Sequence, residues 1–490
     1  MIDRILQQLT YNPDEPLIFS SGLFLFLFLA FTFGYMLMQH TRTLRLLFVT
    51  AFSYYFYYKS SGFYFFLLAI VTLSDYLIAG MVARSQSTAR KKWLVVLSLV
   101  IDLGLLGYFK YTNFFAGMWA QMVGANFQPW DIFLPVGISF FTFQSMSYVI
   151  DVYRGQLKPL PSILDYAFYV SFFPQLVAGP IVRARDFAPQ IRKPLAISHD
   201  MFARGVFFIM IGLFKKAVIS DYISLNFVDR IFDNPSLYSG VENLLGAYGY
   251  AMQIYCDFSG YSDMAIGIAL LLGFRFPINF NAPYASVSIT DFWRRWHISL
   301  SSWIRDYIYI SMGGNRRGKV RQYINLIVTM LLGGLWHGAS MNFVAWGGMH
   351  GVALAVHKWM RENVFHHDKH YASHGVRKLV AVVLTFHFVV FCWIFFRNHT
   401  FEASWTMISK IFTDFHPELF LQVIEGYWVV FAMMAFGYLT HFIPDRWNDS
   451  VVALIRRGGV VVGALLIAAV IYIVIQVKSS EIQPFIYFQF

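Results

Sequence analysis

Residues 291–310 read DFWRRWHISLSSWIRDYIYI, and residues 331–340 read LLGGLWHGAS. Each stretch carries one histidine, His297 in the first and His337 in the second, inside chain that is predominantly apolar. Ionisable side chains at membrane depth are costly and therefore mark working sites by default. Histidine is also the side chain best suited to exchanging a proton near neutral pH. The two stretches predict a membrane-embedded protein that handles protons, either an enzyme or a proton-coupled carrier.

The composition supports this membrane assignment. Of the 490 residues, 57% are hydrophobic and only 13% are charged, whereas a soluble domain carries roughly 25% charged residues. A membrane span needs about 20 apolar residues, and residues 17–39 and 458–477 reach that length without a charge. The sequence therefore predicts an all-α polytopic membrane protein. The expected spans are 17–39, 46–58, 62–82, 93–110, 135–152, 163–182, 202–222, 241–257, 261–276, 323–345, 346–359, 378–397, 420–442 and 458–477.

Several of these apolar stretches are too short to cross a bilayer alone, notably 46–58 and 346–359. Irregular backbone at membrane depth is tolerated only where protein or a water-filled cavity surrounds it. The short pieces therefore indicate a funnel or cavity rather than a plain helix bundle.

The net charge of +11 is explained by short basic loops. Such loops stay on the cytoplasmic side of a membrane. Two expected spans separate the first two loops, which places the N-terminus outside and residues 1–16 in an extracytoplasmic segment. No soluble basic domain is available to bind a nucleic acid, and residues 17–39 are expected to be retained as an anchor. The basic loops contain Arg42 and Arg45; Arg84, Arg90, Lys91 and Lys92; Arg183, Arg185, Arg192 and Lys193; and Arg316, Arg317, Lys319 and Arg321.

The cysteine and histidine spacing does not favour a metal site. Cys256 and Cys392 lie in separate expected spans, so neither a disulfide nor a cysteine-type zinc site is predicted. His366, His370 and His374 have i, i+4, i+8 spacing, but they lie in the polar stretch FHHDKHYASHG, for which an aqueous loop is the plainer interpretation. We therefore expect no bound metal.

The segment 277–322 is predicted to contain an amphipathic helix at an interface. Apolar and aromatic residues recur there with i, i+3, i+4, i+7 spacing, and the charged residues Arg305 and Asp306 lie largely off that stripe. Spacing alone does not separate a functional His297 from one that merely belongs to such a helix. The stripe consists of Trp293, Trp296, His297, Leu300, Ile304 and Tyr307.

His337 is the stronger functional candidate. It follows Trp336 and lies beside Gly333 and Gly334, and small residues allow close helix contact or admit a ligand. An apolar side chain would pack there at lower cost than a histidine. His350 lies thirteen residues further on, which on one continuous helix is about 220° around the axis. His350 is therefore expected to face another direction and to play a supporting role.

Acidic residues also recur within the expected spans, most notably Asp257 and Asp263 in QIYCDFSGYSDMAIG. They either relay protons, as in a transporter, or hold Arg or Tyr partners, and the structural role is favoured for each. The sequence contains no Gly-rich phosphate loop and no GxSxG elbow. A histidine site without its own nucleophile suits transfer of an activated group to an incoming hydroxyl.

Five longer motifs resemble the membrane-bound O-acyltransferase family, in particular its branch of bacterial alginate O-acetyltransferase membrane subunits. They occur in order between about residues 17 and 400, and together they are highly specific. The motifs are LPVGISFFTFQSMSYVIDVYRG (Leu134–Gly155), FFPQLVAGPIVR (Phe172–Arg183), QIYCDFSGYSDMAIG (Gln253–Gly267), ITDFWRRWHISLSSWIRDYIYISMGGNRRG (Ile289–Gly318) and TMLLGGLWHGASMNFVAWGGMHG (Thr329–Gly351).

The resemblance implies a helical shell around a central funnel or tunnel, with a catalytic membrane domain over 17–400 and a transmembrane extension over 401–490. It implies that His337 is the family's near-invariant histidine and His297 its second site residue, a histidine in this branch and often an asparagine elsewhere. The donor implied is acetyl-CoA, with Arg316 and Arg317 as candidates for its phosphates, although the positive-inside rule alone explains that loop. The side chains expected to line the tunnel or position substrate are Trp293, Trp296, Trp336, Arg305, Asp306 and His350.

The function implied is O-acetyl transfer at the bacterial inner membrane. The acceptor would be an extracytoplasmic polysaccharide, or the serine of a separate SGNH-like partner, for which this chain has no room. Two alternatives remain: transfer of D-alanine to teichoic acid, as in a sister branch, and a proton-coupled transporter. The transporter alternative predicts that Asp257 or Asp263 is essential while the histidines are dispensable.

Overall fold

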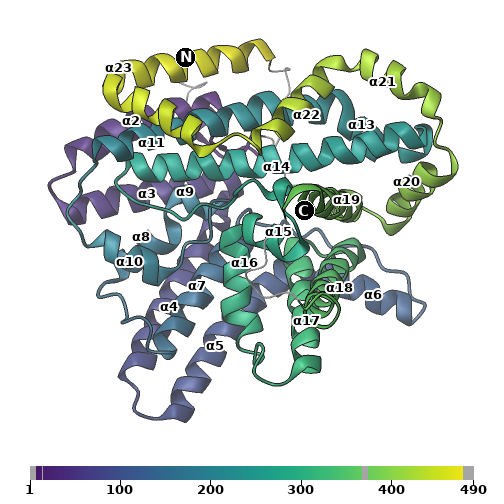
Figure 1. The fold of residues 1–490 in the computed structure, drawn as a ribbon. Coiled ribbons are helices and arrows are strands. Elements are labelled where there is room, and N and C mark those ends of the chain that lie inside the picture. Colours follow the sequence, from purple (N-terminus) through teal and green to yellow (C-terminus); the bar gives the residue numbers. More distant parts are fainter. Residues whose placement is uncertain (1–6, 14, 367–373, 478–490) are drawn as a thin grey trace. The chain divides into compact units, whose positions relative to one another are not determined.

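The computed structural model describes residues 7–13, 15–366 and 374–477, and within these ranges every regular element is a helix (Figure 1). The chain divides into two compact units. The first comprises residues 1–205 and 264–277, and the second comprises 206–263 and 278–490. Two helices, α11 (His199–Phe214) and α14 (Gly240–Leu271), contribute residues to both.

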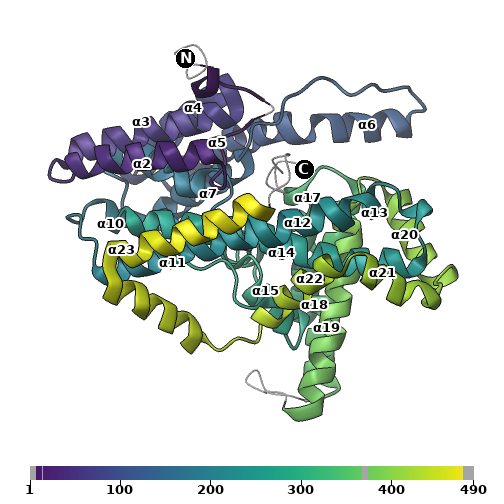
Figure 2. The same ribbon diagram turned by 90° about the horizontal axis from the view of Figure 1, so that it is seen from above.

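The first unit is built from helices of very different lengths. Figure 2 shows α2 beside α3, and contacts join α2 to α3 and α3 to α4. Its interior is largely aromatic: Phe173, for example, lies within 5.1 Å of Phe52 and 5.4 Å of Phe31 between ring centroids. Its elements are α2 (Gly22–Leu37), α3 (Arg42–Ser61), η1 (Gly62–Tyr64), α4 (Phe65–Arg84), α5 (Thr88–Leu106), η2 (Gly107–Tyr111), α6 (Thr112–Met122), α7 (Ile138–Tyr153), α8 (Ile163–Ser171), α9 (Phe173–Leu176) and α10 (Ala184–Ile191).

The second unit contains both candidate histidines. Its helices are frequently interrupted, and η3, η4 and η7 are π-helical turns, a form that recurs at functional sites. Its elements are η3 (Lys215–Ser220), α12 (Asp221–Ile223), η4 (Ser224–Val228), α13 (Asp229–Asp233), η5 (Pro235–Leu237), η6 (Pro283–Ala285), α15 (Ile289–Arg295), α16 (Ile298–Ile304), η7 (Arg305–Tyr309), α17 (Lys319–His337), α18 (Met341–Asn363), α19 (Gly375–Arg397), α20 (Phe401–Thr413), η8 (Pro417–Leu419), α21 (Phe420–Gly426), α22 (Trp428–Thr440) and α23 (Asp445–Val477).

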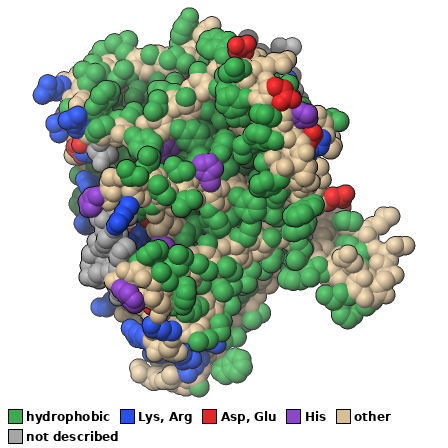
Figure 3. All heavy atoms as spheres, turned by 45° about the vertical axis from the view of Figure 1, so that its right-hand side comes forward, with side chains coloured by type: hydrophobic (Ala, Val, Ile, Leu, Met, Phe, Trp, Pro, Cys, Tyr) green, Lys and Arg blue, Asp and Glu red, His purple; other side chains and the backbone are tan. Residues whose placement is uncertain are grey.

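The outer surface has the character of a lipid-facing protein. On α2, the side chains of Phe26, Leu29 and Phe33 are 72%, 71% and 68% exposed, and hydrophobic side chains dominate the face shown in Figure 3. Large contiguous apolar surface is rare on soluble monomers. Exposure of these phenylalanine and leucine side chains is therefore explained by contact with lipid.

Far fewer helices than the fourteen expected spans are long and apolar enough to cross a membrane on their own. Four qualify among the described residues, and a fifth span results if Pro417–Gly426 and Trp428–Thr440, which meet at 92°, are counted together. The four are Arg42–Arg84, Thr88–Met122, Gly375–Arg397 and Arg446–Val477.

Two expected span boundaries were wrong, while a third lies close to where it was expected. Stretches 46–58 and 62–82 fall in α3 and α4, which a break at Gly62, with φ of +58°, separates within the helical stretch Arg42–Arg84. The membrane side of the N-terminus, which was inferred from two crossings there, stays a prediction. Stretch 241–257 and residues 261–271 of the next stretch form the single helix α14, because the intervening Phe258–Gly260 are helical too. The expected boundary between 323–345 and 346–359 instead falls at Gly338–Ser340, between α17 and α18.

Both cysteines are free and buried, which confirms the prediction that they form no disulfide. Among the described residues no group of acidic, histidine or cysteine side chains is suited to hold a metal ion. Of the histidine series in the polar loop, His370 lies outside the described residues.

Candidate functional site

His337 is the last residue of α17 and lies at the turn that reverses the chain into α18 (Figure 1). Its side chain is only 3% exposed. Trp346 from the first turns of α18 packs edge-on against it, with ring centroids 5.1 Å apart, and Phe396 from α19 packs at the same centroid distance. The histidine is thus held by aromatic rings from two other helices.

A seam of glycines brings α17 and α18 into backbone contact beside His337. A Cβ atom on Gly334 would lie 2.2 Å from the carbonyl oxygen of Phe343, and one on Gly347 would lie 2.4 Å from that of Met330. Real Cβ atoms essentially never approach so closely. The close helix contact that the glycines near His337 predicted is therefore present, and the glycines fix the distance between the two helices.

His297 lies at a break between two short helices. Ser288 caps α15 by accepting a hydrogen bond from the Asp291 amide at 3.2 Å, and α15 ends at Arg295. His297 itself has φ of +43°, in the left-handed region, and α16 begins at Ile298. The continuous amphipathic helix expected over 293–307 was therefore wrong. The apolar stripe persists because the residues on both sides of the break face a shared interior.

Aromatic rings connect the three candidate histidines. The Trp336 ring lies between His297 and His337, at centroid distances of 6.1 and 5.0 Å respectively. On the other side, Trp346 is 4.9 Å from His350. His337 and His350 thus both contact Trp346. The single continuous helix assumed for the two histidines was wrong, because α17 ends at His337 and the turn after it folds α18 back along α17.

His350 contacts two of the tryptophans near His337. It is fully buried, and its Nδ1 accepts a hydrogen bond from the indole nitrogen of Trp293 at 3.3 Å. Trp293 in turn contacts Trp346, with centroids 5.7 Å apart. His350 therefore orients two of the tryptophans around His337.

A cavity of about 560 Å³ opens beside His337. Among its lining residues are His337, Trp293 and Trp346, together with Met330 and Gly333 from α17. The lining also contains further aliphatic side chains and a set of uncharged polar ones; the polar residues are Thr290, Ser301, Ser302, Tyr309, Asn315, Gln322 and Thr329. His337 is therefore reachable from a space large enough for the reactive end of a substrate.

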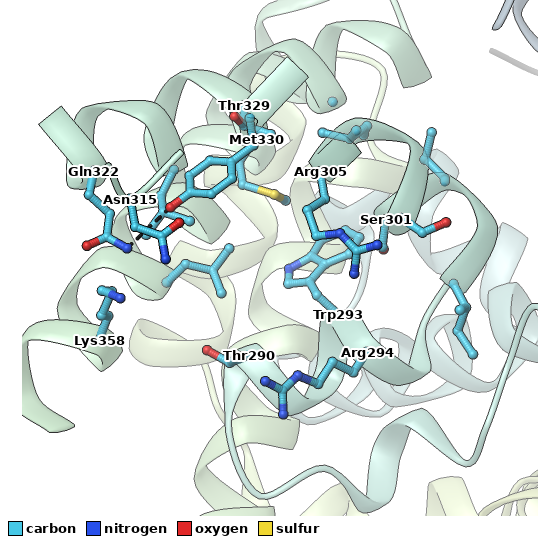
Figure 4. Close-up of a pocket in the computed structure, with 18 of the residues that line it drawn as sticks. Thr290, Trp293, Arg294, Ser301, Arg305, Asn315, Gln322, Thr329, Met330 and Lys358 are labelled. Carbon is cyan, nitrogen blue, oxygen red and sulfur yellow. Dashed lines mark hydrogen bonds between the residues drawn. The ribbon is translucent and has the colours of Figure 1, made fainter. Parts of the chain in front are cut away.

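The ionisable side chains that line this cavity are positive apart from the histidine and tyrosine. Arg294 and Arg305 extend from one wall, and Lys358 extends from the opposite wall (Figure 4). Arg361 completes the set. No acidic side chain is among the lining residues. The cavity is thus suited to a ligand with an apolar or polar reactive end and an anionic portion.

The four cations are not equally available to a ligand. Arg305 is paired with Asp306, with 2.7 Å between Nε and Oδ1. Lys358 and Arg361 share Glu362, at 3.2 and 3.7 Å. Arg294 is exposed and has no ion-pair partner among the described residues. Its charge is therefore the least compensated at the cavity.

Comparison with known proteins identifies the group to which these motifs belong. The chain is 42% identical over 403 residues to the probable alginate O-acetylase AlgI of Pseudomonas aeruginosa, an alignment that covers 81% of this chain and 75% of that protein. It is 37% identical to the peptidoglycan O-acetyltransferase of Helicobacter pylori, covering 79% and 78% of the two chains. The model of MBOAT, the membrane-bound O-acyltransferase family, matches residues 156–396.

The chain belongs to the membrane-bound O-acyltransferase family. It is an O-acyltransferase and a multi-pass membrane protein. A more distant similarity, 31% identity covering 54% of this chain and 69% of the relative, links it to the teichoic acid D-alanyltransferase of Bacillus subtilis. The site described above lies inside the matched region.

The acidic pair in α14 of this O-acyltransferase is engaged in ion pairs. Asp263 pairs with Lys215 at 2.8 Å, and Asp257 pairs with Lys216 at 2.6 Å. The sequence suggested Arg or Tyr partners, whereas both partners are lysines of the π-helical turn η3. Paired carboxylates fit a structural role, and enzyme family membership removes the main reason to consider a transporter.

The structure sorts the expected tunnel residues of the O-acyltransferase into two groups. Trp293 and Arg305 line the cavity with His337. Trp296 is buried against Phe292 and Trp393, at centroid distances of 5.6 and 5.0 Å, and is not among the lining residues. Also outside the lining set are His297, Trp336, Asp306, His350, Arg316 and Arg317.

Sequence reasoning missed three of the four cations at the cavity: Arg294, Lys358 and Arg361. The only available signal was a local one. Lys358 and Arg361 are separated by three positions, which places them on one face of a helix. Their convergence with Arg294 depends on the packing of α15 against α18, for which the sequence has no local pattern.

Proposed function

We propose that this O-acyltransferase moves an acetyl group from acetyl-CoA to a hydroxyl on the extracytoplasmic side of the bacterial inner membrane. The observation that carries the proposal is the cavity whose lining contains both His337 and four basic side chains. Coenzyme A combines a small thioester end with several phosphates, which is the chemistry that this lining would recognise. The N-terminus is expected to be extracytoplasmic. In this proposal the donor approaches the site from the cytoplasm and the hydroxyl acceptor from the opposite side.

In the proposed reaction His337 is the general base. It takes the proton of the acceptor hydroxyl while the hydroxyl oxygen attacks the thioester carbonyl. The new C–O ester bond forms, the C–S bond breaks, and the proton passes to the departing thiolate. The aromatic rings around His337 exclude bulk water, which limits hydrolysis of the thioester. For His297 two roles are open: it orients the acceptor, or it binds the thioester carbonyl.

The acceptor is proposed to be a polysaccharide, or a serine of an SGNH-like extracytoplasmic partner that passes the group on. The named activities of the Pseudomonas and Helicobacter relatives support a glycan acceptor. The D-alanyl alternative rests on the similarity to teichoic acid D-alanyltransferase, which covers a smaller share of this chain. Residues 401–490 are proposed to extend the catalytic membrane domain of 17–400.

The test uses purified protein in lipid nanodiscs with acetyl-CoA labelled in the acetyl group. Label is expected to reach an added glycan or partner, and His337→Gln, which keeps size but not basicity, is expected to lower transfer by roughly 10²–10⁴-fold. His387→Ala is the control, because this exposed histidine lies outside the cavity lining; it hydrogen-bonds to Val383 O in its own helix at 2.8 Å and packs edge-on against Tyr248. Normal transfer by His337→Gln refutes the proposed base, and transfer of labelled D-alanine instead of acetyl favours the alternative.

A further inference from the structure

Asn279 holds the helix break at which His297 lies. It is 1% exposed and belongs to the segment between α14 and α15. Its backbone carbonyl accepts a hydrogen bond from the amide of Ile298 at 2.9 Å, and the amide of Asn281 donates to the Arg295 carbonyl at 2.9 Å. The segment around Asn279 therefore pairs with the chain on both sides of His297 and supports its left-handed backbone.

The orientation of the Asn279 side-chain amide is fixed by its neighbours. Its Oδ1 accepts from the backbone amide of Ser299 at 3.2 Å and from the hydroxyl of Ser299 at 2.9 Å. Its Nδ2 donates to the hydroxyl of Ser262 at 3.2 Å. A backbone N–H can only donate, so the atom facing Ser299 must be the oxygen. The alternative amide orientation would place two N–H groups against each other.

The amide orientation in turn fixes the tautomer of His297. Nδ1 of His297 lies 3.1 Å from the same Oδ1. An amide oxygen accepts and does not donate, so Nδ1 must carry the proton. In the neutral ring Nε2 then carries the lone pair, and this buried atom has no hydrogen-bond partner among the described residues. Phe258, with its ring centroid 4.6 Å away, holds the imidazole in place.

We propose that Asn279 is a positioning residue that fixes neutral His297 as a hydrogen-bond acceptor at Nε2. The inference rests on the proposed function and resolves the role that was left open there. An acceptor nitrogen cannot donate to a thioester carbonyl. Instead, an O–H group of the molecule that receives the acyl group donates a hydrogen bond to Nε2. His297 therefore orients that molecule, while His337 faces the cavity proposed to bind the acyl donor.

Two substitutions separate this role from simple structural support. Asn279→Ala removes the tautomer constraint, and kcat/KM for the acceptor is expected to fall at least about tenfold at every pH, as for loss of other buried partners that orient a histidine. Asn279→Asp still accepts from Nδ1–H but also stabilises the imidazolium, which has no lone pair at Nε2. Its activity is expected to approach that of the wild type at high pH, with the acidic limb of the pH profile moved to higher pH.

The matched control is Asn243→Ala. Asn243 is equally buried in the same unit, and its Nδ2 donates to three backbone carbonyls, those of Pro235, Tyr238 and Ser239, at 3.0 Å each. It shares the cost of losing a buried amide, but among the described residues it has no hydrogen bond to a histidine. Once rates are normalised to folded protein, Asn243→Ala is expected to keep wild-type kcat/KM and pH profile.

A nitrogen-15 spectrum of ring-labelled histidine provides an independent readout, because the two tautomers differ at each ring nitrogen. The wild type is expected to show His297 protonated at Nδ1, and Asn279→Ala to show a mixture. Two results overturn the inference, provided that His297→Ala and His337→Gln are inactive. One is that Asn279→Ala matches Asn243→Ala in kcat/KM, and the other is that the spectrum shows His297 protonated at Nε2. If those two histidine variants are fully active, the proposed function itself fails.

Discussion

Replacing Gly347 with alanine tests the claim that the glycine seam sets the geometry around His337. The added Cβ would lie 2.4 Å from the backbone carbonyl oxygen of Met330, whereas ordinary contacts begin at 3.4 Å. Because the obstacle is backbone rather than a flexible side chain, α18 must move away from α17 by about 1 Å. Overpacking of this kind costs about 1–3 kcal/mol, against a helix-propensity gain of at most about 1 kcal/mol.

The same displacement should reduce activity, since Trp346, one residue before Gly347, packs on His337. A misplacement of about 1 Å costs on the order of 100-fold in rate. The assays are thermal unfolding in one detergent and acyl transfer normalised to folded protein. Gly348→Ala is the matched control, because its Cβ would meet only Leu331 Cδ2 at 3.5 Å. The reasoning is refuted if the two alanine variants have the same stability and rate.

Two further predictions concern charge. Arg294→Gln is expected to raise the KM for acetyl-CoA more than Arg305→Gln does, because Arg305 is paired with a carboxylate while Arg294 is not. Initial rates measured at varied acetyl-CoA and salt concentrations test this expectation. An equal rise in KM for the two variants contradicts it. Lys215→Met alone is expected to destabilise the protein by about 3–5 kcal/mol by leaving Asp263 unpaired, and the double variant with Asp263→Leu should recover much of that loss. The free energies of unfolding of the single and double variants test this expectation. Strictly additive losses of stability would argue against coupling between Lys215 and Asp263.

The parts of this protein that the sequence predicted well depend on composition and on residues close together in the chain. The all-helical membrane fold, the family motifs and the free cysteines follow from such features. The environment of His337 was also foreseeable, because Gly333 and Gly334 are its near neighbours in sequence. Local patterns of small, apolar and aromatic residues carry this information directly.

The parts that the sequence did not predict depend on where helices stop. An i, i+3, i+4 pattern counts apolar positions, and two short helices facing one interior satisfy it as well as a single helix does. The break at His297 is accompanied by a side-chain contact with Asn279, eighteen residues earlier, and by a hydrogen bond from the Ile298 amide to the Asn279 carbonyl. Lys215 and Asp263 likewise meet across 48 residues. Partners so far apart in the chain leave no periodic pattern in the sequence. Both the helix break and the cation-lined cavity are therefore visible only in the three-dimensional structure.

The left-handed backbone at residue 297 limits which amino acids the chain can carry there. Glycine tolerates this conformation, and among other residues asparagine, aspartate and histidine are enriched in it. Of that short set, only histidine offers a ring nitrogen whose lone pair accepts a hydrogen bond while the other ring nitrogen donates one. The main-chain dihedral angles thus restrict which side chains can occupy this position. A relative with a different reaction can carry asparagine in place of histidine here with the same turn conformation.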